Sequence, residues 1–142
     1  MQFSDNSAKI IDRVHNRIIN GYSKALSEIG ISYTQATVCC VLAEAPNQQM
    51  TQRSLRQHLG VANATLSGVL KRMVKRKLIC QAELETDSRV KVITLTSEAK
   101  ELYPSILSCM DKVTEKIYAG FSQDEKEYLL SLLFKVQANL QS

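Results

Sequence analysis

The sequence predicts a mainly α-helical fold with one small β-hairpin, and three observations support this fold class. Apolar residues recur at three- and four-residue steps over most of the chain, as they do along the buried face of a helix. Residues that cap helix N-termini, Ser, Thr or Asn, stand just before several of these stretches. Residues 79–95 instead contain two β-prone runs joined by a short polar stretch, which is typical of a hairpin.

Length and composition narrow the class of protein. The chain has 142 residues, of which 44% are hydrophobic, and this is enough for one domain with a core. No apolar run approaches the roughly 20 residues that span a bilayer, and no secretory leader is visible. Four cysteines without regular spacing do not resemble a secreted disulfide framework. We therefore expect a cytoplasmic protein without a membrane partner.

Two helices are expected before residue 50. The first ends at Gly30, and its apolar positions are Ile10, Ile11, Val14, Ile18, Tyr22, Ala25, Leu26 and Ile29. Ser32 and Gln35 form a capping-box pattern, in which each side chain bonds the backbone N–H of the other residue. A second helix is expected to begin there and to end near Pro46.

The segment 51–78 has the order helix, tight turn, helix. Thr51 can cap a short helix that Gly60 ends, and Asn63 can cap a longer helix after the turn. Two β-prone runs around the polar tip TDSR follow directly. This order predicts a helix-turn-helix with a β-hairpin wing.

Two further helices are expected after the hairpin. The first begins near Ser97 and contains Pro104, so we expect either a kink at that proline or a later start. Ser122 and Glu125 form a second capping box before a final, leucine-rich helix.

The long flanking helices predict a homodimer. A small winged helix would not need them, and the first helix has apolar residues on more than one face. We expect a single domain, residues 1–142, in which residues 51–95 bind DNA while residues 1–30 and 97–142 form a C2 dimer. Such a dimer places two recognition helices about one DNA turn, roughly 34 Å, apart. The alternative is packing of these helices within one chain.

Positive charge is concentrated in the middle of the chain. Residues 51–91 contain nine Lys or Arg and three acids, a net charge of +6 in a chain whose total is +4. Five of these cations fall within seven residues: Lys71, Arg72, Lys75, Arg76 and Lys77. The helix that begins at Asn63 contains no acid, whereas a merely solvated helix normally mixes both signs. Phosphates of double-stranded DNA are therefore the expected partner, with a plain solvated face as the alternative.

A helical wheel divides this basic helix into two sides. One side should pack on the domain and consists of Leu66, Val69, Leu70, Met73 and Val74. The opposite side is small near its N-terminus, which allows close approach to base edges, and cationic near its C-terminus. The wing adds Arg89, whose guanidinium Asp87 would orient toward the narrow minor groove. The expected DNA contacts are Gln52, Arg53, His58, Asn63, Ala64, Thr65, Ser67, Gly68, Lys71, Arg72, Lys75, Asp87 and Arg89.

These residues resemble a known family. The runs MTQRSLRQHLGV, NATLSGVLKRMVKRKLI, DSR and ITLTSEA are similar to the winged helix of the multiple-antibiotic-resistance regulator (MarR) family. The resemblance implies a homodimeric transcriptional regulator that binds a palindromic operator and is released by a small aromatic or phenolic effector, or by thiol oxidation. A family pocket would lie between the first, second and fifth helices, near His15, Tyr22 and Tyr33, and no effector residue is assigned among them. The chain departs from the family pattern at Lys77, where a helix-ending Gly is usual, at Gly68 and at Ala99.

Other chemistries have little support. The sequence contains no phosphate-binding Gly loop and no motif that places two carboxylates together, so we expect no enzyme activity and no cofactor. It also contains no CxxC or HxxxH spacing, so we expect no metal. Cys80, beside the basic helix end, is the cysteine with the best case for redox sensing. The sequence thus predicts a dimeric, sequence-specific repressor. The alternatives are a thiol-based redox regulator on the same fold and a winged-helix protein-interaction module without DNA binding.

Overall fold

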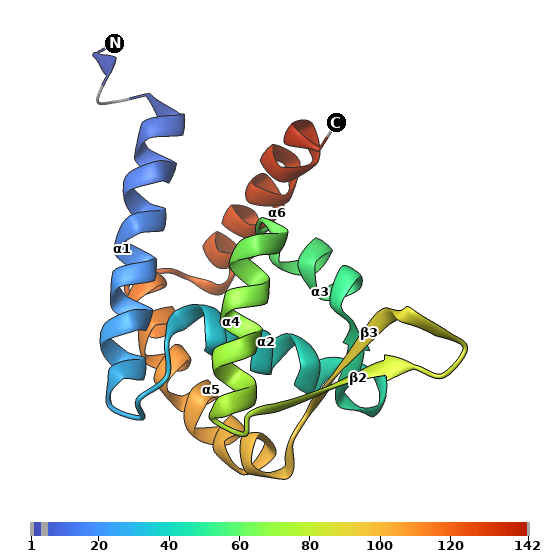
Figure 1. Cartoon of the computed structure of the whole chain (residues 1–142). Coiled ribbons are helices and arrows are strands. Elements are labelled where there is room, and N and C mark those ends of the chain that lie inside the picture. Colours follow the sequence, from blue (N-terminus) through green and yellow to red (C-terminus); the bar gives the residue numbers. More distant parts are fainter. Residues whose placement is uncertain (1, 4–5, 142) are drawn as a thin grey trace.

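The computed structural model describes residues 2–3 and 6–141 and confirms the mainly α-helical fold (Figure 1). The helices in this part of the chain are α1 (Ser7–Ser27), α2 (Tyr33–Glu44), α3 (Gln52–Leu59), α4 (Asn63–Lys75), α5 (Ser97–Ile117) and α6 (Gln123–Leu140). The strands are β1 (Gln49–Thr51), β2 (Ile79–Leu84) and β3 (Asp87–Leu95), and a 3-10 turn, η2 (Pro46–Gln48), precedes β1. Among the described residues, no helix is both long enough and apolar enough to span a bilayer.

The sheet has one strand more than the sequence predicted. Its order is β1-β3-β2 and both pairings are antiparallel, with Gln49 opposite Thr94 and Ile79 opposite Leu95. The short strand β1 ties the start of α3 to the base of the wing. The wing tip is also tighter than expected, because Asp87 already pairs with Leu84 and belongs to β3.

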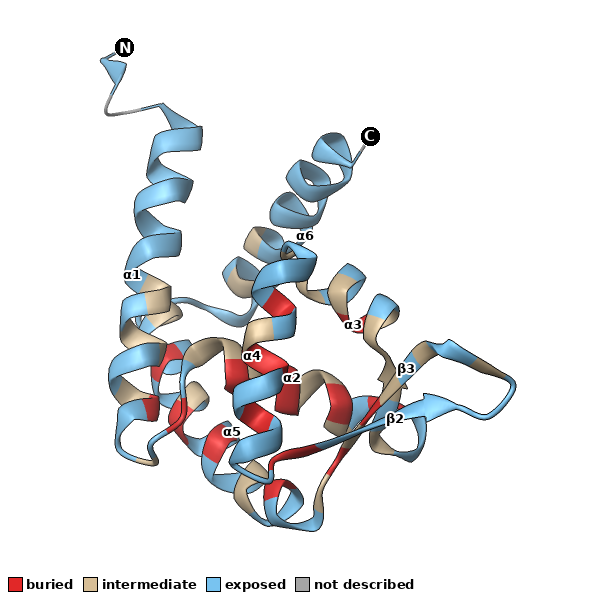
Figure 2. Ribbon diagram, in the orientation of Figure 1, coloured by how far each residue is buried: buried red, intermediate tan, exposed pale blue. Residues whose placement is uncertain are grey.

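The core lies where α2, α4 and α5 meet the base of the sheet, and the outer wing and α6 contribute little to it (Figure 2). Its largest fully buried side chains are Leu26, Leu42, Leu55, Leu66, Leu70, Met73, Ile79, Ile93, Ile106, Val38 and Cys39.

One prediction for the basic helix is wrong. Val74, expected to pack on the domain, is 40% exposed because it lies at the edge of the buried side and faces the wing.

Most predicted helix ends are confirmed. Gln35 N donates to Ser32 Oγ at 3.2 Å and Ser32 N donates to Gln35 Oε1 at 3.3 Å, which completes the first capping box. Ser122 and Glu125 form the second box with bonds of 3.1 and 2.9 Å. Thr51 caps α3, since its Oγ1 accepts from Ser54 N at 3.1 Å.

Two details of the helix ends were predicted wrongly. Asn63 does not cap α4, because Ala62 takes the extended N-cap position and its carbonyl accepts the first helical bond, from Leu66 N. Asn63 is instead the first helical residue. The later start considered for α5 is also wrong, since that helix begins at Ser97 and continues through Pro104.

The turn after α4 is strained at Lys77. Its φ is +59°, a left-handed value that glycine adopts at little cost and other residues do not. The bonds Lys77 N to Val74 O and Leu78 N to Met73 O, both 3.0 Å, form the Schellman pattern that normally has glycine at this position. The Lys77 carbonyl also accepts from Thr96 Oγ1 at 2.6 Å, which holds this conformation in place.

We therefore predict that Lys77→Gly stabilises the protein. Relief of strain, less the entropy that glycine adds to the unfolded chain, should give roughly 0.5–1 kcal/mol, or about 2–4 °C in melting temperature. Lys77→Ala is the matched control, because it removes the same charge without relieving the strain. Thermal unfolding followed by circular dichroism would contradict the interpretation if both variants gained equally.

Both terminal helices expose apolar side chains. The N-terminal part of α1 and the C-terminal part of α6 extend from the same side of the body (Figure 1). All 18 residues of α6 are described and none is buried. The exposed large apolar residues of these helices are Ile10, Ile11, Val14, Tyr128, Leu130, Leu132, Leu133, Phe134, Val136 and Leu140. Packing of α6 within one chain is thus not what the structure shows, and a patch of this kind marks an interface.

Candidate nucleic-acid interface

The recognition helix, α4, presents the two sides that the wheel predicted, with Val74 as the exception. Leu66, Val69, Leu70 and Met73 are buried, while Ala64, Thr65, Ser67, Lys71, Arg72 and Lys75 are exposed. Gly68 is half-exposed, and a Cβ added to it would lie 3.7 Å from Arg72 Nη1. No side chain projects from the exposed side of α4 at Gly68, and the guanidinium of Arg72 lies beside this position.

A concave surface of about 900 Å³ lies between α3, α4 and the wing. It is lined by Thr51, Gln52, Arg53, Arg56, Asn63, Ser67, Arg89, Val90 and Lys91. A second hollow of about 340 Å³ adjoins it and is lined by Gln52, Ser67, Lys71, Val74, Lys75, Gln81 and Lys91. Among the described residues, the two linings contain six cations and no carboxylate. This composition suits a polyanion.

The structure brings together seven of the predicted contacts in these two hollows: Gln52, Arg53, Asn63, Ser67, Lys71, Lys75 and Arg89. Ala64, Thr65, Gly68 and Arg72 lie outside the two linings but on the exposed or half-exposed side of α4. His58 lies outside them too, and its Nδ1 is 3.0 Å from the Ser54 carbonyl oxygen. Its ring is thus already engaged with the last turns of α3.

The sequence reasoning missed two cations and one amide side chain that line the hollows. Lys91 follows Arg89 by two positions on β3, and the period of two along a strand could have placed both on one face. Arg56 follows Arg53 by three positions on α3 and lines the same hollow. Gln81 carries no charge, and only the pairing of β2 with β3 shows where it lies.

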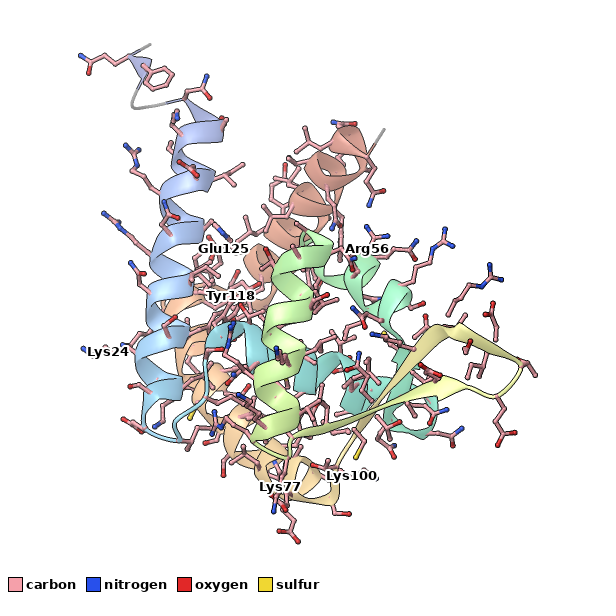
Figure 3. All side chains as sticks on the ribbon, in the orientation of Figure 1. Lys24, Arg56, Lys77, Lys100, Tyr118 and Glu125 are labelled. Atoms are coloured by element: carbon pink, nitrogen blue, oxygen red, sulfur yellow. The ribbon has the colours of Figure 1, made fainter. Side chains whose placement is uncertain are left out.

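The five cations between residues 71 and 77 do not all face the same surface. Lys71 and Lys75 face the second hollow. Arg76 instead donates from Nη1 to the Gly30 carbonyl at 2.6 Å and to Gln35 Oε1 at 3.1 Å, and so ties the end of α4 to the loop between α1 and α2. Lys77, in the strained turn, lies at the far end of α4 from Arg56 (Figure 3). Part of this charge therefore holds the fold together and does not face the hollows.

Asp87 holds the arginine of the wing through three hydrogen bonds. Asp87 accepts from Arg89 Nε at 3.0 Å and from Nη2 at 3.2 Å, and its Oδ1 also accepts from the backbone N of Arg89 at 3.0 Å. These bonds hold the pKa of Asp87 below its ordinary value. The Arg89 side chain is 89% exposed, so its guanidinium projects from the wing while it is bonded to Asp87.

Comparisons with known proteins agree with this geometry. No family model matches the chain. Solved structures with the same fold include S. aureus MepR in complex with DNA, with a TM-score of 0.88 and 21% identity over 95% of this chain and 98% of that chain. A mutant MarR from E. coli in complex with operator DNA gives a TM-score of 0.82 and 22% identity over 91% of each chain. The HTH-type transcriptional regulator MgrA of Staphylococcus aureus is 31% identical over 123 residues, which cover 84% of this chain and 80% of that protein.

The chain belongs to the MarR family. The family resemblance noted in the winged helix is thus confirmed, and the relative MgrA is an HTH-type transcriptional regulator. This regulator departs from the family pattern at Lys77 without losing the fold, because the Schellman bonds and Thr96 hold the turn.

The four cysteines of this MarR-family chain differ in exposure, and burial makes most of their thiols less reactive. Burial and the neighbouring Cys40 raise the pKa of the Cys39 thiol to about 12, which disfavours the reactive thiolate. Burial also raises the pKa of Cys40, whose Sγ lies 3.8 Å from Met110 Sδ. Cys109 is buried, and Cys80 is an exposed free thiol on β2. Among the described residues, no group of three or more His, Cys, Asp or Glu side chains could hold a metal ion.

The region expected to hold a family effector has two features. The rings of Tyr22 and Tyr33 stack on each other, with centroids 5.3 Å apart. A groove of about 560 Å³ runs between α1 and α5, but no residue of α2 lines it, and neither do His15, Tyr22 and Tyr33. Its apolar residues are Val14, Ile18, Gly21, Ala25, Val113 and Ile117, and its charged residues are Arg17, Lys24, Glu28, Lys112 and Lys116.

Proposed function

We propose that this MarR-family chain is a homodimeric repressor that binds a palindromic operator and is released from it by a small aromatic or phenolic effector. The observation that carries the proposal is the pair of carboxylate-free hollows, in which the recognition helix, α3 and the wing place six cations on one surface. A surface used for protein partners would mix charge and apolar residues, whereas this one suits the phosphates of a duplex.

Each part of the surface has a distinct role in this proposal. Arg53, Arg56, Lys71, Lys75 and Lys91 neutralise phosphates and fix the register on the backbone. Ala64, Thr65 and Ser67, at the exposed N-terminal half of α4, approach base edges in the major groove. Arg89 enters the minor groove from the wing.

Solved structures of similar proteins support both DNA binding and release by an effector. MepR and the mutant E. coli MarR are complexes with DNA. The DNA binding of Bordetella bronchiseptica BpsR is regulated by 6-hydroxynicotinic acid, and CouR from Rhodococcus jostii RHA1 is bound to p-coumaroyl-CoA. Aromatic acids are therefore the first effectors to try here, by their ability to release the protein from operator DNA.

Lys75→Ala tests the phosphate contacts. Loss of one phosphate contact should weaken binding to operator and to random duplex by similar factors, and should reduce the slope of log affinity against log salt by about one unit. Fluorescence anisotropy at several salt concentrations measures both quantities. Lys100→Ala is the matched control, because Lys100 is exposed on α5 and lies far from Arg56 (Figure 3). A changed base preference with an unchanged slope would contradict the role given to Lys75.

A further inference from the structure

Three polar side chains from three separate elements form a chain of hydrogen bonds across the second hollow. Nε2 of Gln81, on β2, donates to Gln52 Oε1 at 2.9 Å. Gln52 is the first residue of α3, and its own Nε2 donates to Ser67 Oγ on α4 at 3.4 Å. All three line the hollow that also contains Lys71 and Lys75. The chain of bonds therefore joins the wing strand to the recognition helix on the surface proposed to face DNA.

The direction of these bonds determines what Ser67 offers to a ligand. An amide side chain has one accepting end and one donating end. Gln81 donates to the side-chain carbonyl oxygen of Gln52, so the NH2 group of Gln52 is the end that faces Ser67. Ser67 Oγ then already accepts one bond, and its own proton is left to donate outward. Without Gln81, the Gln52 amide can turn over, accept that proton and leave Ser67 as an acceptor.

We propose that Gln81 is a positioning residue that acts through Gln52 to make Ser67 a hydrogen-bond donor toward DNA. The inference rests on the proposed function and gives a residue of the wing strand a part in base selection. A donating Ser67 favours base edges that carry acceptors in the major groove, such as guanine N7 and O6 or thymine O4, over the amino group of cytosine. The surrounding cations set the overall affinity, and Gln81 sets a preference.

The experiment uses the full-length protein and an operator that the parent protein selects from a randomised duplex pool. Each base pair of the half-site is then varied, in both halves alike, and binding is measured by fluorescence anisotropy. Gln81→Met keeps the length of the side chain and removes both polar ends. It should lose roughly two- to tenfold discrimination at one base pair, the worth of one hydrogen bond. Its salt slope and its melting temperature should stay at the parent values, because Gln81 is uncharged and exposed.

Two further variants separate positioning from a general structural effect. Ser67→Ala should lose discrimination at the same base pair, and the double variant should lose no more than Ser67→Ala alone. Gln81→Glu has no donor, so Gln52 must turn its NH2 group toward residue 81 and its carbonyl toward Ser67. The preference at that base pair should then shift toward cytosine.

Several results would overturn the role of Gln81. These are an unchanged profile for Gln81→Met, a loss spread evenly over the half-site, additive losses in the double variant, or a Gln81→Glu profile like that of the parent. A parent protein that selects no sequence from the pool would overturn the proposed function as well, so the two failures are distinguishable.

Discussion

The variant Leu133→Glu/Val136→Glu is expected to sediment as a monomer at micromolar concentration and to lose tight operator binding. Both residues lie on α6, where they are 43% and 40% exposed in the single chain. Their burial in a dimer is the physical reason for the expected effect. Isolated monomers would each bind one half-site, without the fixed spacing that a dimer provides.

The size of the effect follows from symmetry. In a C2 dimer each substitution occurs twice, so two substitutions remove four apolar side chains from the interface. Less than half of each side chain is still exposed in the single chain, so each can contribute roughly 0.6–1.2 kcal/mol on dimerisation. The loss is then about 2.5–5 kcal/mol, which is roughly two to three and a half powers of ten in the dimer dissociation constant. The charge of four buried carboxylates adds to this cost.

Ser131→Glu/Ala138→Glu is the matched control, because it adds the same charge to two exposed positions on the face of α6 opposite Leu133 and Val136. It should remain a dimer if the apolar face is the interface. Analytical ultracentrifugation of all three proteins, with circular dichroism to check that each is folded, measures the outcome. A parent protein that is monomeric at micromolar concentration would contradict the proposed dimer.

The parts of the fold that could be predicted from the sequence are those that local chemistry determines. A capping box needs only two residues three positions apart, so Ser32 with Gln35 and Ser122 with Glu125 could be read directly. Gly60, at φ +64°, ends α3 for an equally local reason. The basic helix, the turn before it and the hairpin after it then define the winged helix.

What the sequence could not show depends on contacts between distant segments. Strand β1 has three residues and exists because β3 pairs with it, more than 40 positions further along the chain. The sequence groups Arg76 with the other cations of the recognition helix, whereas in the fold its guanidinium donates to the Gly30 carbonyl. Gln81 enters the candidate interface only because the wing strand places it beside Gln52. Periodicity assigns a residue to a face, but the partner of that face is set by the tertiary fold.

The second large effect is expected from a substitution in the wing that lowers the affinity for operator DNA. Arg89→Ala should weaken operator binding by at least about 1 kcal/mol, the lower range for one charged base-edge contact in a groove. The expectation is motivated by geometry, because Arg89 projects from the wing with its guanidinium held in place by Asp87. Fluorescence-anisotropy titrations at two salt concentrations measure the loss. Arg89→Ala binding as tightly as the parent would falsify the minor-groove role.

Asp87→Asn separates orientation from charge at the same tip. The asparagine oxygen can still accept from the backbone N of Arg89, so the turn is kept, but the second oxygen that accepts from Nη2 is lost. Simple electrostatics predicts tighter binding to any duplex, since one negative charge is removed. If the carboxylate instead positions the guanidinium, the variant should bind random duplex at least as well as the parent and bind the operator more weakly. Tighter binding to both duplexes would show that Asp87 only forms the turn, because a freed Arg89 would then reach the groove as well as one that is held.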